Sequence, residues 1–180
     1  FLCCIMNSYS EKDDTKMKSN RFPIPNSKLR EGAQLCLKNA ERLCADADLL
    51  RVHKEYATSI SLLVLCSEEA AKGLWLLKKA GEGEEITQTE WKEWTMKRAH
   101  IRKLKYLREK LKVAGHDVFE PISGEQAKAI KESGLYIDWE KDREWSTCYQ
   151  EKDEATKFYY YAFLRDIAEE AIKLLEDSLL

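Results

Sequence analysis

The sequence has few of the residues that interrupt helices. Only seven glycines and three prolines occur in 180 residues, and these two residue types break long helices or form the tight turns between strands. Their scarcity argues against a fold of many short strands and favours long helices. With 44% hydrophobic and 34% charged residues, the composition is that of a globular chain, long enough for one domain with a hydrophobic core.

Long apolar runs are also lacking. No run approaches the ~20 residues that a membrane-spanning helix requires, so we expect no membrane partner. The apolar stretch at residues 1–6 is too short for the core of a signal peptide, and no basic segment precedes it. The chain does not begin with methionine, and we leave the residues before Met6, or even before Met17, out of the fold prediction as an upstream tail.

Recognisable metal and cofactor motifs are absent as well. None of the six cysteines forms a C-x-x-C pair, and no cysteine–histidine set has zinc-site spacing. The motifs GxxxxGK[ST], GxGxxG, GxSxG and HExxH do not occur. We therefore predict no cofactor and no metal. Cys36, Cys44 and Cys66 fall in apolar helical stretches, and we interpret the cysteines as reduced cytosolic thiols.

The net charge of −2 gives the whole chain no attraction to nucleic acid, but one segment is strongly basic. Residues 90–112 contain nine lysines and arginines against three glutamates. Trp91, Trp94 and Tyr106 are interleaved with these cations. The segment therefore suits either phosphate attraction with base stacking or an ordinary solvated helix face.

Apolar residues recur at helical spacing in four long segments, which predicts four main helices. We expect residues 1–25 to be a polar, flexible leader and residues 26–180 to form one domain. The helices should cover, in order, about 26–54 with a cap on Asn26 or Ser27, 55–81, 87–115 with a capping box of Thr87 and Glu90, and 151–180.

The region before the last helix is predicted to be less regular. Residues 125–133 have the pattern of a short helix, and the aromatic residues 135–139 predict an extended segment without a partner strand. The last helix should turn its apolar residues inward, Phe158 among them. The predicted fold is all-α: an up-and-down bundle of four main helices with a short helix and an extended segment inserted before the last.

Three charged residues interrupt the most apolar of these helices. Glu68, Glu69 and Lys72 follow the apolar run 60–66 and precede a second apolar run, 74–77. Buried charges are costly unless they are paired. The three residues are therefore either a self-satisfying ion pair where the helix leaves the core, or an inward-facing polar site.

His100 is the best candidate for acid–base chemistry. It lies at helical spacing from Leu104, Leu107 and Leu111 and therefore shares their inward face. An inward imidazole beside carboxylates can act as a general acid or base, although a hydrogen-bonded core histidine is the commoner outcome.

A polar flank on the first helix is a further candidate. Asn39, Arg42 and Asp46 lie along one edge of the apolar stripe. The spacing of Arg42 and Asp46 also suits a surface ion pair.

Four motifs in this order resemble the AbiV family of abortive-infection proteins, within the HEPN superfamily of helical proteins. They are the segments NAERLCADA at 39–47, SEEAAKG at 67–73, HIRKL at 100–104, which looks like the family's H-x-x-K element, and LYIDW at 135–139. The resemblance covers roughly residues 28–178 and implies a HEPN-like helical bundle.

The resemblance also implies a cytoplasmic bacterial or archaeal protein that acts in phage defence on RNA or the translation machinery, with a phage protein as trigger and a homodimer as assembly. Many HEPN proteins are metal-independent ribonucleases with an R-x(4–6)-H motif. No arginine stands at that distance before His53, His100 or His116. Whether the chain is an enzyme therefore stays open, and the alternative is a non-catalytic helical interaction module whose polar cluster is structural.

For the effector hypothesis we expect one inward polar cluster. Glu69 or His100 would be the acid or base, and Lys72 with Lys103 would bind phosphate. The catalytic candidates are Glu69, Lys72 and His100, and the binding or supporting candidates are Asn39, Asp46, Glu68, Arg98 and Lys103.

Overall fold

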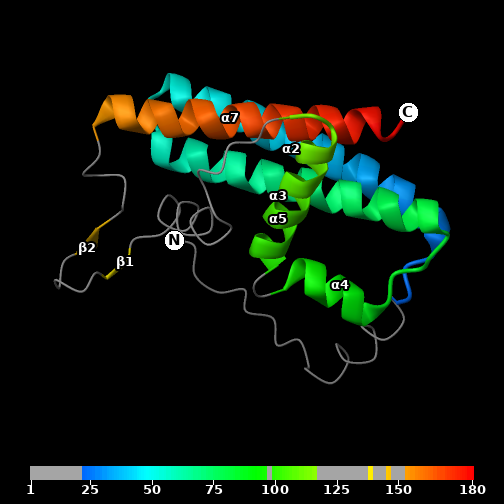
Figure 1. The fold of residues 1–180 in the computed structure, drawn as a ribbon. Helices are drawn as coiled ribbons and strands as arrows, with labels where there is room; N and C mark the ends of the chain where they lie inside the picture. The colour runs from blue at the N-terminus through cyan, green and yellow to red at the C-terminus, as the bar shows by residue number, and fades with distance from the viewer. Residues whose placement is uncertain (1–21, 97–98, 117–137, 140–144, 147–152) are drawn as a thin grey trace, which may run out of the picture.

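The computed structural model describes residues 22–96, 99–116, 138–139, 145–146 and 153–180. Three long helices lie side by side: α2 (Leu29–Val52), α3 (Tyr56–Glu82) and α7 (Glu154–Asp177), with α3 packed against both of the others (Figure 1). The shorter α5 (Ala99–Val113) crosses these helices, and α4 (Gln88–Thr95) precedes it. The predicted all-α, HEPN-like bundle is confirmed. No helix in the described ranges has the length and apolar character needed to cross a membrane.

The first helix follows the predicted apolar stripe. Its buried residues are Leu29, Ala33, Cys36, Ala40, Leu43, Cys44 and Ala47. A 3-10 turn at Asn26–Lys28 precedes the helix, whose N-cap is Lys28, so the predicted cap at Asn26 or Ser27 is wrong. The Asn26 side-chain amide instead donates to the carbonyls of Lys79, Ala80 and Glu84, at 3.1 to 3.3 Å. The carbonyls of Lys79 and Ala80 also accept hydrogen bonds from the backbone N–H groups of Glu84 and Gly83, so the Asn26 amide adds to the bonds that close the end of α3.

The predicted second helix becomes α3, the central helix of the fold. Fourteen of its residues are buried, and they include apolar side chains on every side of the helix. Such a helix requires neighbours all round it, and α2, α5 and α7 supply them. Gly73 permits a close approach of α7 and α2 to α3, because a Cβ atom added there would lie 2.6 Å from Leu175 Cδ2 and 3.2 Å from Cys36 Cβ.

The predicted third helix, from Thr87 to about residue 115, is wrong, because the chain forms two helices there. The capping box at the start of α4 is present: Thr87 Oγ1 accepts from the Glu90 N–H at 3.2 Å, and Glu90 Oε2 accepts from the Thr87 N–H at 2.9 Å. After Thr95 the chain leaves the helix, with Met96 in an extended conformation.

Aromatic packing explains this break. Trp94 stacks on Trp75 of α3, with ring centroids 4.5 Å apart, and meets Tyr106 of α5 edge-on at 5.3 Å. Twelve residues separate Trp94 from Tyr106, which is about 18 Å along a straight helix. Because the two rings are in contact, the chain has to bend back between them.

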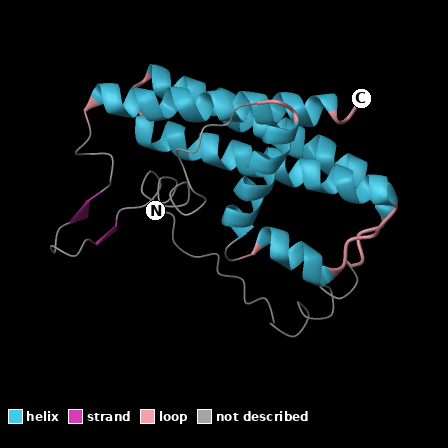
Figure 2. Cartoon of the chain, in the orientation of Figure 1, coloured by secondary structure: helices cyan, strands magenta, loops and turns pink. Residues whose placement is uncertain are grey.

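The described part of the region before α7 contains one strand pair. Asp138–Trp139 pairs antiparallel with Trp145–Ser146, which corrects the expectation that residues 135–139 have no partner strand (Figure 2). The predicted short helix at 125–133 lies outside the described residues. At the other end of the domain, Ile24 and Ile86 exchange two backbone hydrogen bonds, at 2.9 and 3.0 Å, so the chain just before α2 is attached to the chain just before α4.

The last helix begins at a capped residue, with Asp153 Oδ1 accepting from the Thr156 N–H at 2.8 Å. The expectation that Phe158 faces inward is wrong, because 49% of its surface is exposed. The inward stripe includes Tyr161 one turn later, which points its hydroxyl at Asp48 of α2. The buried residues of α7 are Tyr161, Leu164, Ala168, Ala171 and Leu175.

Candidate functional site

Glu68 is the centre of a polar contact between α3 and α5. Its side chain is only 4% exposed, and the Nδ1 atom of His100 lies 2.9 Å from Oε2 and 3.1 Å from Oε1. The ammonium nitrogen of Lys103, which is also buried, lies 3.8 Å from the same Oε2. One buried carboxylate therefore contacts an imidazole and an ammonium group that are one helical turn apart.

The contact arises from the helical register of both segments. His100 and Lys103 are three residues apart on α5, so both side chains reach the same neighbour. An unpaired buried carboxylate would cost several kcal/mol, which the two partners offset. An ionised carboxylate can only accept hydrogen bonds, so the His100 Nδ1–H is the donor here. In the neutral ring this tautomer places the lone pair on Nε2.

Glu69 and Lys72 form a separate pair on α3. The Lys72 ammonium lies 2.7 Å from both carboxylate oxygens of Glu69, and each side chain is 19% exposed. The structure thus brings His100 and Lys103 to Glu68 rather than to Glu69. Within the described ranges, neither Glu69 nor Lys72 forms a hydrogen bond or an ion pair with His100.

The two pairs nevertheless share a neighbour on α2. Burial raises the pKa of the Cys36 thiol to about 11, and the nearby cations of Lys72 and Lys103 act in the opposite direction. Both ammonium groups therefore lie within electrostatic range of one thiol. At neutral pH this thiol is protonated, so it is not a nucleophile in its present surroundings.

The polar flank of α2 lies apart from this cluster. Arg42 donates to Asp46 at 2.7 Å and to Asn39 at 2.9 Å. The side chains of Arg42 and Asp46 are 60% and 47% exposed. Asn39 and Asp46 thus belong to a surface network of their own rather than to an inward cluster with His100.

The remaining candidates are Arg98 and the other two histidines. Arg98 lies outside the described residues. His53 is exposed, and His116 pairs with Glu170, its Nδ1 lying 3.0 Å from Oε2. Among the residues that the structure describes, no group of three or more histidine, cysteine or acidic side chains is arranged to hold a metal ion.

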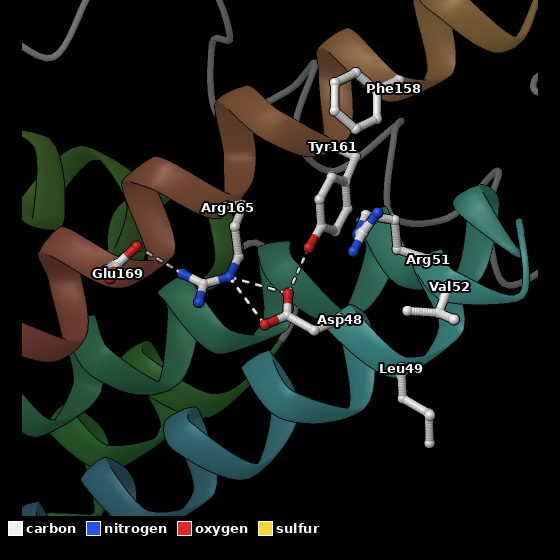
Figure 3. Close-up of a pocket in the computed structure, with 8 residues that line it drawn as sticks. All are labelled: Asp48, Leu49, Arg51, Val52, Phe158, Tyr161, Arg165 and Glu169. Atoms are coloured by element: carbon white, nitrogen blue, oxygen red, sulfur yellow. Dashed lines mark hydrogen bonds and ion pairs between the residues drawn. The ribbon is translucent and has the colours of Figure 1, made fainter.

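Sequence reasoning missed a second polar network, between α2 and α7 (Figure 3). Asp48 accepts hydrogen bonds from the Tyr161 hydroxyl and from Arg165 Nε, the latter at 3.0 Å, and Arg165 also donates to Glu169 at 2.9 Å. The spacing of Arg165 and Glu169 could have been found as an i, i+4 pair. The contacts to Asp48 could not, because they join residues more than 110 positions apart.

This second network is electrostatically self-satisfied. Burial acts to raise the pKa of Asp48, but the hydrogen bonds from Tyr161 and Arg165 outweigh it and hold that pKa below its usual value. Burial and the Asp48 carboxylate raise the pKa of Tyr161 to about 12. The network lines an open groove of about 740 Å³, together with Leu49, Arg51, Val52 and Phe158. We interpret it as a link between helices.

Comparison with known proteins identifies the family. The HEPN_AbiV family model, described as AbiV, matches residues 28–172. Neither the curated proteins nor the solved structures gave a significant match to the chain. The matched region includes α3 and α5 and therefore the Glu68–His100 contact. Since the match extends over well more than half of the sequence, the chain belongs to the AbiV family of HEPN proteins.

Proposed function

We propose that the chain is an abortive-infection effector that acts on RNA, with His100 as its general acid or base. Membership of the AbiV family supports a role in abortive infection, and thus in phage defence. The observation that carries the catalytic part is the contact between the buried Glu68 carboxylate and Nδ1 of His100, a side chain that is 32% exposed.

This contact suits acid–base chemistry because a buried carboxylate on Nδ1 fixes both the tautomer and the orientation of the ring. In the proposed reaction, Nε2 of His100 accepts the proton of a ribose 2′-hydroxyl. The 2′ oxygen attacks the adjacent phosphorus, and the bond from phosphorus to the 5′ oxygen breaks. The leaving oxygen takes a proton from the imidazolium or from water, which yields a 2′,3′-cyclic phosphate and a 5′-hydroxyl.

The lysines supply positive charge for this step. Lys103 lies one turn from His100 and would stabilise the extra negative charge on the phosphate oxygens in the transition state. Lys72 is a second candidate for that role, although its ammonium group is paired with the Glu69 carboxylate. Because Glu69 pairs with Lys72, the geometry favours His100 over Glu69 as the base.

The proposal is tested with the purified full chain and end-labelled RNA. Wild type should produce fragments that end in a 2′,3′-cyclic phosphate, and His100→Ala should lower the rate by about 10²- to 10⁴-fold. Arg42→Ala, which changes only the surface network, should cleave like wild type. Equal cleavage by wild type and His100→Ala, or no cleavage by wild type, would exclude this mechanism.

The family resemblance also supports the remaining parts of the proposal. These are a cytoplasmic location, a component of the translation machinery as an alternative target, a phage protein as the trigger and a homodimer as the assembly. Sedimentation analysis of the full chain tests the last of these directly, because a monomer at working concentrations would exclude the homodimer.

A second candidate function is a non-catalytic interaction module. It is favoured by the observation that Glu69 and Lys72 satisfy each other and that Glu68 is engaged by two partners. Buried polar groups of this kind can be retained because they specify a unique packing. Thermal unfolding and a phage-survival assay separate the two functions. If Glu68→Gln lowers the melting temperature but leaves defence per folded molecule unchanged, the cluster is structural.

A further inference from the structure

The helix that carries His100 is much more basic than the rest of the chain. Ala99–Val113 contains six lysines and arginines and a single carboxylate, Glu109, whereas the whole chain has a net charge of −2. One of the six cations, Lys103, is buried at Glu68. The other five are outside the polar cluster, and four of them are exposed: Arg102, Lys105, Arg108 and Lys112.

Three of the exposed cations form one line. Lys105, Arg108 and Lys112 follow each other at spacings of three and four residues, so they lie on one flank of α5. We call these three residues the basic flank. The flank borders the helix face that bears His100, and it extends over two turns of the helix, about 10 Å.

The two lysines in this flank form no ion pair within the described residues, although Glu109 lies four residues after Lys105 and three residues before Lys112. Both lysines are exposed. Arg102, three residues before Lys105 on α5, differs from them because it lies 2.6 Å from the Glu93 carboxylate. Lys110 is also different, since its ammonium group lies over the Tyr106 ring, 5.4 Å from the centroid.

The aromatic residues near the basic segment are engaged with one another. Trp94 stacks on Trp75 and meets Tyr106 edge-on. The ring centroid of Trp91 lies 6.5 Å from that of Trp75 and 6.5 Å from that of Phe22. RNA bases could stack on these rings only if the aromatic residues moved apart. The sequence suggested phosphate attraction combined with base stacking; this arrangement fits the phosphate attraction but not the stacking.

We infer that the basic flank of α5 binds the sugar–phosphate backbone of RNA without reading its bases. The inference rests on the proposed action on RNA. It adds the place where the RNA strand lies and the part of the strand that is recognised. Regularly spaced, flexible lysines suit a polymer that carries a charge on every residue. Without stacking or base contacts, the binding is independent of sequence and strongly dependent on salt.

Fluorescence anisotropy with labelled oligonucleotides tests the inference. The ribose 2′ oxygens are methylated in these probes, so wild type can bind the strand but has no nucleophile with which to cut it. Affinity is measured over a range of salt concentrations for oligouridylate and oligoadenylate. The test variant is Lys105→Gln with Lys112→Gln. The matched control is Lys38→Gln with Lys173→Gln, which removes two exposed lysines that form no ion pair within the described residues of α2 and α7.

We expect wild type to bind both oligonucleotides with similar affinity. In the test variant, the slope of log affinity against log salt should fall by about 0.7 for each lost phosphate contact, which weakens binding roughly tenfold near 0.15 M salt. The control variant should keep the wild-type slope. An unchanged slope in the test variant, or an equal change in the control, overturns the inference.

Two further measurements separate this inference from the catalytic proposal. His100→Ala should retain binding and its salt dependence, so a lack of cleavage alone leaves the basic flank intact as an RNA surface. Competition with polyglutamate tests the alternative that the flank binds an acidic protein. If polyglutamate displaces the oligonucleotide at equal charge concentration, the flank selects no nucleic acid and the inference fails.

Discussion

Glu68 and His100 lie 32 positions apart in the sequence, on different helices, yet the carboxylate and the imidazole meet at 2.9 Å. The carboxylate is almost fully buried, whereas about a third of the imidazole side chain is exposed. The carboxylate is therefore fixed inside the bundle, and the imidazole ring extends from it towards solvent. Loss of either partner therefore has different consequences for stability and for chemistry.

A double-mutant cycle measures how strongly the two residues are coupled. Glu68→Gln and His100→Asn, alone and together, should give a coupling free energy of about 1–3 kcal/mol, because residues within one buried network are not additive. The same cycle on Arg42 and Asp46, an exposed i, i+4 pair, should give about 0.5 kcal/mol or less. Urea unfolding of wild type and the six variants supplies the seven free energies. A coupling for Glu68 and His100 no larger than that of the surface pair would contradict the geometry.

Sequence periodicity predicted that His100 lies on the inward face of its helix, and it left open whether the charged residues of α3 face inward or pair where the helix leaves the core. It was not sufficient to predict which glutamate His100 meets. Consecutive residues on a helix point about 100° apart, so Glu68 and Glu69 face different neighbours. The choice between them depends on how α3 is rotated against α5, which the packing of the whole bundle sets.

The sequence also did not show that the predicted third helix is divided into α4 and α5. Between Trp94 and His100 the sequence contains no glycine or proline that would mark a helix end. The bend is required by tertiary contacts, namely the packing of Trp94 on Trp75 and Tyr106. Local propensity is a weak guide where a large aromatic residue has a better partner elsewhere in the fold.

Gly73 should be intolerant of even a single added methyl group. In Gly73→Ala the new Cβ would lie 2.6 Å from the buried Leu175 side chain and 3.2 Å from Cys36 Cβ. Overpacking of this kind costs about 1–3 kcal/mol, partly offset by the better helix propensity of alanine. We expect a net loss of about 1–2 kcal/mol of unfolding free energy.

Gly81 provides the matched control, because it lies in the same helix and a Cβ there would meet no atom within 4 Å. Gly81→Ala should leave stability unchanged or raise it by up to about 1 kcal/mol. Chemical denaturation of both variants gives the comparison. If Gly73→Ala is as stable as Gly81→Ala, the α3–α7 contact is looser than the structure indicates.

The capping box of α4 should make the protein sensitive to acid. The ammonium group of Lys79, followed by the hydrogen bonds from Thr87, lowers the pKa of Glu90 from 4.5 to about 2. A carboxyl group whose pKa is lower in the folded state contributes stability above its unfolded pKa, and that contribution is lost as the pH falls towards the folded value. The window for this loss lies between about pH 4.5 and pH 2.

Glu90→Gln tests this window. The variant should be less stable than wild type at neutral pH, and the difference should shrink as the pH falls below 4.5, because wild type alone loses the contribution of the carboxylate. Denaturant titrations at several pH values provide the measurement. Glu85→Gln changes an exposed carboxyl group that forms no ion pair in the described ranges, and it should follow wild type. A Glu90→Gln difference that stays constant down to pH 3 would rule out the effect.

Asp48 should be the more important of two neighbouring aspartates for the link between α2 and α7. Asp48→Asn replaces a charged acceptor of hydrogen bonds from Tyr161 and Arg165 with a neutral one. Because the Asp48 side chain is 41% exposed, we expect a loss of about 1 kcal/mol, below the usual range for bonds to charged groups. Asp46→Asn, in the surface network, should cost less than about 0.5 kcal/mol. Equal stabilities of the two variants in urea would show that the network adds nothing to the bundle.

Trp94 should hold α4 and α5 in their bent arrangement. Its ring is 8% exposed and contacts one ring of α3 and one of α5, so Trp94→Ala removes both contacts and leaves a cavity. Substitutions of this kind cost about 3–5 kcal/mol. Met96→Ala, two residues later and 59% exposed, should change stability by no more than about 0.5 kcal/mol. Since α5 carries His100 and Lys103, Trp94→Ala should also weaken the Glu68–His100 coupling in a repeated double-mutant cycle. An undiminished coupling in the Trp94→Ala background would mean that α5 is positioned by α3 and α7 alone.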